Sequence, residues 1–206
     1  LALPDGQIVA RTTQPFTLFD RASKHAPDAL PIWADDPAVR DWLSRHGYTL
    51  DAEAGLRITA QWDEDTWRYV KRGGRVLLCA ASPQALPETP VTIEARRHTP
   101  WSGDWASSFA WVRPGVTRLP GGPILDFGWQ GVFPEHVITG LASEHTLAGL
   151  FVGWVHMGAA LIGTVPLGEG VLAVTTFPVL PPDSSPVRTV LLHDLIRAVS
   201  RRENNR

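Results

Sequence analysis

Cys79 is the only cysteine in the 206-residue chain, and a cysteine at the end of a strand is a position where some enzymes carry their nucleophile. It follows the apolar run Val-Leu-Leu at 76–78, and small residues and Pro83 come after it. This pattern predicts a buried strand that stops at a turn. A reactive thiol needs a nearby base or positive charge that lowers its pKa. The unbroken apolar run before Cys79 favours burial instead, so we predict that Cys79 is a small buried core residue.

Acidic side chains are the second group that could do chemistry, as general acid and base. Asp63, Glu64 and Asp65 are adjacent, but a helix start explains such a run without catalysis. The other candidates are Asp104, Asp126, Glu135 and Glu144. Any two of these could reach the roughly 5 to 10 Å separation of a glycosidase pair. The sequence favours no particular pair, so we expect no catalytic residue.

Histidines and glycines give no recognisable cofactor motif. None of the seven histidines has His-x-His or His-Glu-x-x-His spacing. Glu-His occurs twice, at 135–136 and 144–145, and could bind zinc or manganese, although polar loop residues are the favoured interpretation. The glycines of LPGGP, GEG and RGGR lack phosphate-loop spacing and are interpreted as turns. We expect neither metal nor cofactor.

Tryptophan provides the strongest positive signal. The chain has 9 Trp, and several lie in two aromatic segments, TPWSGDWASSFAW at 99–111 and DFGWQGVF at 126–133. Flat aromatic faces beside polar groups suit sugar rings, whose C–H faces stack while their hydroxyls need partners. The alternative is that these rings anchor a long loop in the core. The predicted substrate-binding residues are Trp101, Asp104, Trp105, Trp111 and Trp129.

The segments around these residues alternate between strands and helices. Strands are expected at PIWA (31–34), YTL (48–50), LRITA (56–60), RVLLCA (75–80) and VTIEARR (91–97), and on both sides of a turn at 168–170. Helices are expected after Asp36, over 63–72 and, with Ser185 as cap, at the C-terminal end. Strands alternating with helices predict a parallel sheet with helices on both faces. Residues 82–148 are expected to form a long, irregular, aromatic-rich insertion.

The overall composition limits the partners. The formal net charge is −2, which gives no reason to expect nucleic acid or an anionic membrane. No apolar run reaches the roughly 18 residues that span a bilayer. The first ten residues have no signal-peptide pattern and no initiating Met, so we expect a mature piece or an excised fragment. We expect a soluble bacterial protein, cytoplasmic or secreted.

The block WDEDTWRYVKRGGRVLL, and GEGVLAVTTF followed by SPVRTVLLHDLI, resemble parts of class I glutamine-amidotransferase-like domains. The version that they resemble is the non-catalytic domain appended to bacterial glycoside hydrolases of family two, the β-galactosidase and β-glucuronidase group. The leading DGQIVARTTQPFTLF is similar to the last strand of the sandwich that precedes such a domain. The resemblance covers roughly residues 30–200.

This resemblance implies a three-layer, flavodoxin-like α/β domain over 31–206, with 1–30 as a linker or a terminal strand of a preceding domain. It does not bring a catalytic site with it. The family's Gly-x-Cys-x-Gly elbow is replaced by residues 77–81, Leu-Leu-Cys-Ala-Ala, and the late strand ends in TTFPVLPP without the family's His-Pro-Glu.

The expected function is therefore that of a non-catalytic accessory domain of a carbohydrate-active enzyme. It would brace the catalytic barrel of the parent enzyme, or another subunit, or shape the substrate entrance, and carbohydrate is a further candidate partner. The alternatives are a stand-alone hydrolase that uses a carboxylate or Cys79, and a free sugar-binding module.

Overall fold

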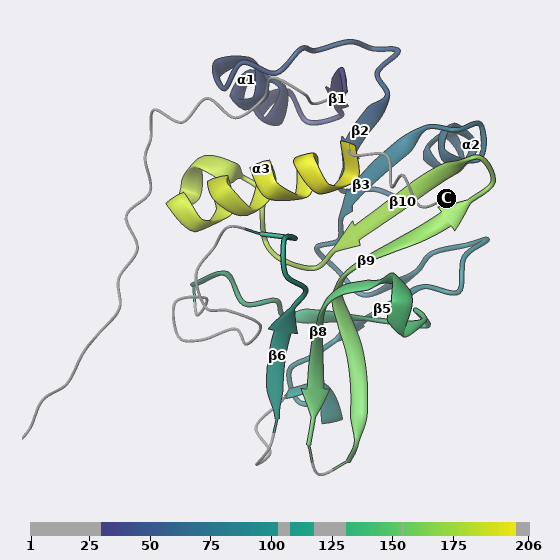
Figure 1. The fold of residues 1–206 in the computed structure, drawn as a ribbon, viewed down its shortest axis with the longest axis vertical. Coiled ribbons are helices and arrows are strands. Elements are labelled where there is room, and N and C mark those ends of the chain that lie inside the picture. Colours follow the sequence, from purple (N-terminus) through teal and green to yellow (C-terminus); the bar gives the residue numbers. More distant parts are fainter. Residues whose placement is uncertain (1–29, 103–107, 118–130, 154, 201–206) are drawn as a thin grey trace, which may run out of the picture.

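The computed structural model describes residues 30–102, 108–117, 131–153 and 155–200. In these ranges the chain forms one mixed sheet and three α-helices (Figure 1). The expected α/β class is therefore confirmed. The strand order along the main path is β1-β2-β3-β10-β9-β7-β5-β4, and β8 and β6 branch from β9.

Four strands form the parallel half of the sheet. They are β1 (Ile32–Ala34), β2 (Leu56–Thr59), β3 (Arg75–Cys79) and β10 (Gly170–Thr175), and each pairs in parallel with the next. Leu50 adds an isolated parallel bridge to Ile32, on the edge of β1 that β2 does not use. The expected strand at 48–50 is thus reduced to this single bridge.

All three helices begin where their capping residues predict. Helix α1 (Pro37–Arg45) starts after Asp36, whose carboxylate accepts the Ala38 N–H at 2.7 Å. Helix α2 (Glu64–Lys71) starts after Asp63, which accepts the Thr66 N–H at 2.8 Å. Helix α3 (Pro186–Ser200) follows Ser185, which accepts the Arg188 N–H.

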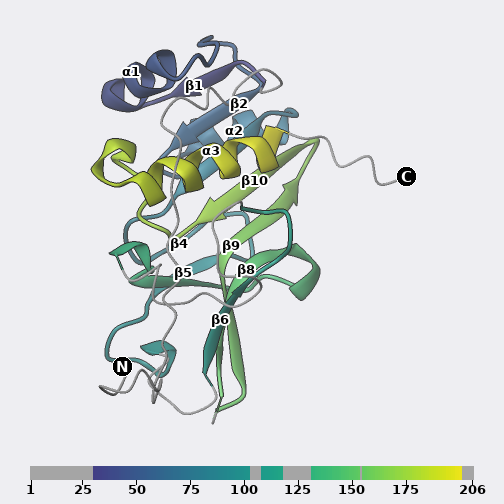
Figure 2. The ribbon, with the colours of Figure 1, turned by 60° about the vertical axis from the view of Figure 1, so that its left-hand side comes forward.

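The helices lie on opposite faces of the parallel half. Residues of α1 and α3 share a core with Leu77, Cys79 and Ala173, whereas Val70 of α2 packs with residues of the other face such as Leu78. Side chains of a strand alternate between faces, so the continuous apolar run of β3 serves both cores. Figure 2 shows α1 and β1 at one end of the molecule.

Close packing explains the glycines of RGGR and GEG. The turn between β9 (Met157–Leu167) and β10 lies against the end of α2. A Cβ atom at Gly170 would lie 2.2 Å from the carbonyl oxygens of both Gly74 and Val70, and one at Gly168 would lie 2.6 Å from the Lys71 oxygen. These glycines are turn residues, as predicted, and the two turns are packed against each other.

The rest of the sheet is antiparallel. It contains β4 (Gln84–Ala85), β5 (Thr92–Ala95), β6 (Phe109–Val112), β7 (His136–Thr139) and β8 (Thr146–Val152), together with the short 3-10 segments Pro100–Ser102 and Ser143–His145. Strand β9 joins the halves, because its last residues pair with β10 and its first residues with β8. Strands β6, β8 and the start of β9 project away from α1 (Figures 1 and 2).

Two expectations about the sheet are wrong. In the described residues three strand pairs are parallel and six are antiparallel, so the sheet is not mostly parallel. The segment 82–148 is not an insertion outside the sheet, because its described parts supply β4 to β7 and the first residues of β8, although most of its described residues lie between these strands. Its strands are short and separated by prolines and turns, so they show little periodicity in the sequence.

Residues 1–29, the bulk of the expected linker or terminal strand, lie outside the described residues. None of the helices in the described part of the chain is long and apolar enough to cross a membrane.

Candidate binding site

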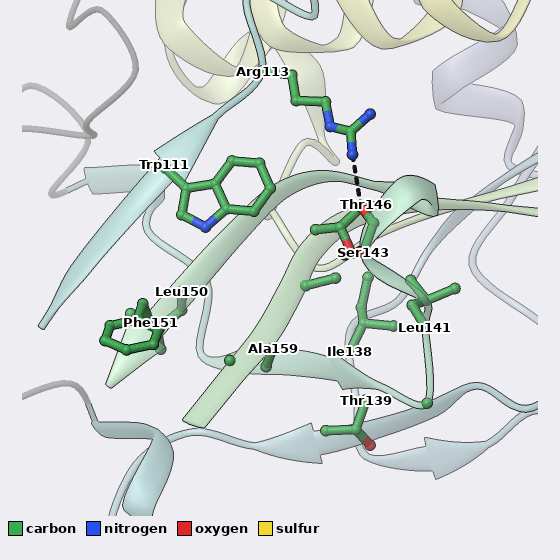
Figure 3. Close-up of a pocket in the computed structure, with 13 residues that line it drawn as sticks. Trp111, Arg113, Ile138, Thr139, Leu141, Ser143, Thr146, Leu150, Phe151 and Ala159 are labelled. Atoms are coloured by element: carbon green, nitrogen blue, oxygen red, sulfur yellow. Dashed lines mark hydrogen bonds between the residues drawn. The ribbon is translucent and has the colours of Figure 1, made fainter. Parts of the chain in front are cut away.

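The described part of the antiparallel half contains a cavity of about 420 Å³ that is lined in part by Trp111 (Figure 3). It lies between the projecting strands β6 and β8 and the strands β7 and β9. Figure 3 shows Trp111 on one side of the hollow, Leu141 on the opposite side and Ile138 between them. Its other lining residues are Arg113, Thr139, Gly140, Ser143, Thr146, Leu150, Phe151, Gly158, Ala159 and Ala160.

Small residues make room for the Trp111 ring and for the hollow beside it. Trp111 pairs with Gly149 across β6 and β8, and a Cβ at Gly149 would lie 2.9 Å from the indole ring. Gly158 and Ala160 of β9 continue this surface of small side chains. A half-buried aromatic face beside a surface with few protruding side chains can accept a flat ligand ring.

Arg113 places a positive charge at the cavity. It lies two residues after Trp111. Side chains two residues apart in an extended chain point to the same face of the sheet, so Arg113 and Trp111 both border the cavity. Its Nη2 donates to the Ser143 carbonyl oxygen at 2.6 Å, and its backbone N–H donates to the Leu147 oxygen at 2.8 Å. Within the described part of the chain, no carboxylate forms an ion pair with the exposed Arg113 guanidinium.

Glu94 holds in place the side chain of Thr139, which lines the cavity. Its carboxylate accepts hydrogen bonds from Thr139 Oγ1 at 2.6 Å and from Trp101 Nε1 at 3.0 Å. Thr139 lines the cavity, whereas Trp101 is only 8% exposed and packs in the larger core. The Trp101 ring is therefore an anchor for the segment around it, and it does not face the cavity.

The other predicted binding residues cannot be placed. Asp104, Trp105 and Trp129 lie outside the described residues, so of the predicted binding residues only Trp101 and Trp111 can be located. The structure separates these two, because one is core and one lines the cavity.

Cys79 is buried at the carboxyl end of β3, as predicted. It is 5% exposed, and burial raises the pKa of its thiol from 9.0 to about 12. The chain passes from β3 into the antiparallel pair β4 and β5, so no helix follows the thiol to form a nucleophile elbow. At neutral pH the thiol is therefore protonated and enclosed.

Each candidate carboxylate caps a helix, forms an ion pair, is exposed at the surface, or lies outside the described residues. Asp63 caps α2. The hydrogen bond that its carboxylate accepts from the Thr66 N–H holds the pKa of the carboxyl below the ordinary value. Glu135 pairs with Arg97 at 2.5 Å, Glu144 is exposed, and Asp104 and Asp126 are outside the described residues. In the ranges that the structure describes, no group of three or more His, Cys, Asp and Glu is arranged to hold a metal ion.

The polar lining residues of the cavity were missed in the sequence. Arg113 could have been found, because Trp-Val-Arg in a strand predicts that the first and third side chains share one face. Thr139 and Ser143 come from different segments, and no spacing rule connects them to Trp111. Compared with known proteins, the chain matches no protein-family model and no curated protein.

Proposed function

We propose that this chain is a non-catalytic accessory domain of a carbohydrate-active enzyme, and that the cavity at Trp111 is a surface through which it binds glycan. The observation that carries the proposal is the placement of the Trp111 face over Gly149, beside a hollow with polar groups at its edge. This is the combination of an apolar platform and orienting polar groups that a sugar ring requires.

The order of the parallel strands supports the amidotransferase-like assignment. With the bridge at Leu50 counted as a strand remnant, the order from that edge is Leu50, β1, β2, β3, β10. In chain order this is 2-1-3-4-5, the order of flavodoxin-like sheets. The first and last helices share one face, with α2 on the other. We propose that the antiparallel half is an elaboration of such a domain.

The state of Cys79 supports a role without catalysis. A nucleophilic thiol must reach its substrate and must ionise near neutral pH. The burial of Cys79 and its raised pKa oppose both. A stand-alone hydrolase that uses Cys79 is for this reason the weaker alternative.

Exposed aromatic side chains support a second candidate function, in which the domain braces the catalytic barrel of the parent enzyme. Phe109 on β6 is 43% exposed and lies 5.5 Å, between ring centroids, from Phe151 on β8. Phe151 also lines the cavity. An aromatic pair on a projecting part of the sheet could instead pack against a catalytic barrel.

The experiment that tests the proposal is a binding screen of the full 206-residue chain against plant and bacterial oligosaccharides, read by ligand-observed NMR. We expect binding by the wild type and its loss in Trp111→Ala. Trp67→Ala is the control, because Trp67 is also half-buried but lies on α2, away from the cavity. Glycan binding that survives Trp111→Ala, or no binding to any glycan, contradicts the proposed binding site. The remaining candidate function is then the bracing of a catalytic barrel.

A further inference from the structure

We infer that the cavity at Trp111 recognises a sugar acid, with the Trp111 ring against the sugar face and Arg113 on the carboxylate. This inference rests on the proposed function, because it names the class of sugar that the same site would take. The ligand is a hexuronate ring, either as a free glycoside or at the end of a chain.

The charge of Arg113 is the first reason. A guanidinium has five N–H donors in a planar fork that matches a carboxylate, and the Ser143 carbonyl uses one Nη2 donor. The side chain has no ion pair in the described part of the chain, a property that it shares with the exposed Arg72, but Arg113 alone of the two borders the cavity. An incoming carboxylate would therefore meet donors that no acidic side chain already occupies.

The arrangement around Trp111 is the second reason. Its Nε1–H makes no hydrogen bond within the described residues and is not among their buried, unpartnered polar atoms, so it remains available to a ligand. Trp111 and Arg113 border the same hollow in Figure 3, one at the side and one above. A ligand that uses both must have an apolar ring face and a negative group at its edge.

The size and local charge restrict the ligand further. About 420 Å³ lies in the lower part of the roughly 300 to 1,000 Å³ range of small-molecule sites, which suits a small sugar unit. Arg113 is the single cation among the cavity residues given above, and the exposed Glu144 follows Ser143, whose hydroxyl lies 3.5 Å from its carboxylate. One cation beside an acidic residue favours a singly charged carboxylate over a doubly charged phosphate.

The test compares acidic and neutral sugars on the full chain by isothermal titration and NMR. The probes are methyl glucuronide and methyl galacturonide, the methyl glucoside and galactoside, glucose 6-phosphate, and a trisaccharide that ends in a uronic acid. The variants are Arg113→Gln, Arg113→Lys and the control Arg72→Gln. Arg72 is also exposed and also donates to a carbonyl oxygen, that of Arg68, but it lies at the end of α2.

We expect the wild type and Arg72→Gln to bind uronides at least about tenfold more tightly than neutral sugars. Arg113→Gln should lose this preference while retaining the weaker binding of neutral sugars, and Arg113→Lys should restore part of it. Tighter binding of the trisaccharide than of the methyl uronides assigns the site to a chain end, and equal binding assigns it to the single ring.

The contrary outcomes are distinct. Equal binding of acidic and neutral sugars, unaffected by Arg113→Gln, overturns the inference and leaves the proposed function standing. Tighter binding of glucose 6-phosphate than of the uronides overturns the carboxylate assignment. No binding of any sugar overturns the inference and the proposed glycan-binding function together.

Discussion

The thiol of Cys79 lies where β3 and β10 end side by side, and the Ala80 N–H donates to the Thr175 oxygen at 2.9 Å directly after it. The same strand end in an open α/β sheet is a common place for a binding crevice. Here it is filled by the protein itself, since Thr175 and Phe177 are buried beside it. Burial, rather than the identity of the side chain, decides that Cys79 is unreactive.

Thiol labelling tests this directly. We expect a disulfide reagent at neutral pH to modify Cys79 only as fast as the protein unfolds, because the thiol is 5% exposed and its pKa is about 12. Labelling should accelerate when denaturant is added. Rapid labelling of the native protein, with a rate that rises from acidic pH, would show that the site opens and that the thiol ionises readily.

The raised thiol pKa also predicts a pH effect on stability. Between pH 9.0 and about 12 the unfolded thiol has released its proton while the folded thiol retains it. Raising the pH in this window therefore favours the unfolded state. Cys79→Ala should lose less stability than the wild type between pH 8 and pH 10.5 in denaturant titrations. Equal losses in the two proteins would indicate that the folded thiol ionises normally.

Trp101 and Trp111 should respond differently to truncation. Trp101 is almost fully buried and donates to Glu94, so Trp101→Ala should cost about 3 to 5 kcal/mol of unfolding free energy. Trp111 is half-buried against Gly149, and Trp111→Ala should cost nearer to the roughly 1 kcal/mol that is typical of single substitutions. Denaturation midpoints measure both, and equal large losses would make Trp111 a core residue too.

Elements with strong local signals were predictable from the sequence. Helix α1 has an N-cap, a proline at its first position and a glycine after its end, and these signals act within a few residues. Strand β3 is apolar on both faces, which is diagnostic of a covered strand. The antiparallel strands were harder because β4 has two residues and β5, β6 and β7 have four each.

The cavity depends on pairings that no local signal encodes. Ile138 of β7 pairs with Ala160 of β9, although 22 positions separate them, and Gly149 pairs with both Trp111 and Ala160. Only this long-range register brings Trp111 close to Thr139 and Ser143. The sequence could therefore identify Trp111, and Arg113 through the strand alternation, but could not identify Thr139 and Ser143 as their neighbours.

The packed turns give a prediction at the scale of elements. Gly170→Ala should destabilise the domain by about 1 to 3 kcal/mol, because its Cβ would overlap the Gly74 and Val70 carbonyl oxygens and force α2 away from β10. Gly131→Ala is the matched control, since no atom lies within 4 Å of a Cβ there. It should be neutral within about 0.5 kcal/mol. Similar thermal midpoints for the two variants would refute the packing argument.

On the scale of the whole molecule, buried polar contacts join the helical layer together. Tyr48, which follows α1, has its hydroxyl 2.6 Å from His193 Nδ1 on α3. Asp194, fully buried on the same helix, pairs with Arg197 at 3.1 Å and accepts a hydrogen bond from Thr117 at 2.9 Å. Buried charges are tolerated when paired in this way. The helical end is thus tied to the segment that follows β6.

The projecting strands β6 and β8 contribute buried residues to one core only, so the two ends of the molecule should differ in local stability. The amides of β3 and β10 lie between two cores, whereas Phe109 of β6 is 43% exposed and Val155, near the β8–β9 connection, is 44% exposed. Segments with fewer buried contacts open more readily without global unfolding. In hydrogen exchange, we expect β3 and β10 amides to exchange only through global unfolding and those of Phe151 and Gly158 to exchange much earlier.

A glycan bound at Trp111 should slow the exchange of β6 and β8 selectively, because it would bridge them to β7. Uniform protection of both ends in the free protein would contradict the expected difference, and uniform slowing on glycan binding would indicate that the ligand stabilises the whole domain rather than the projecting strands.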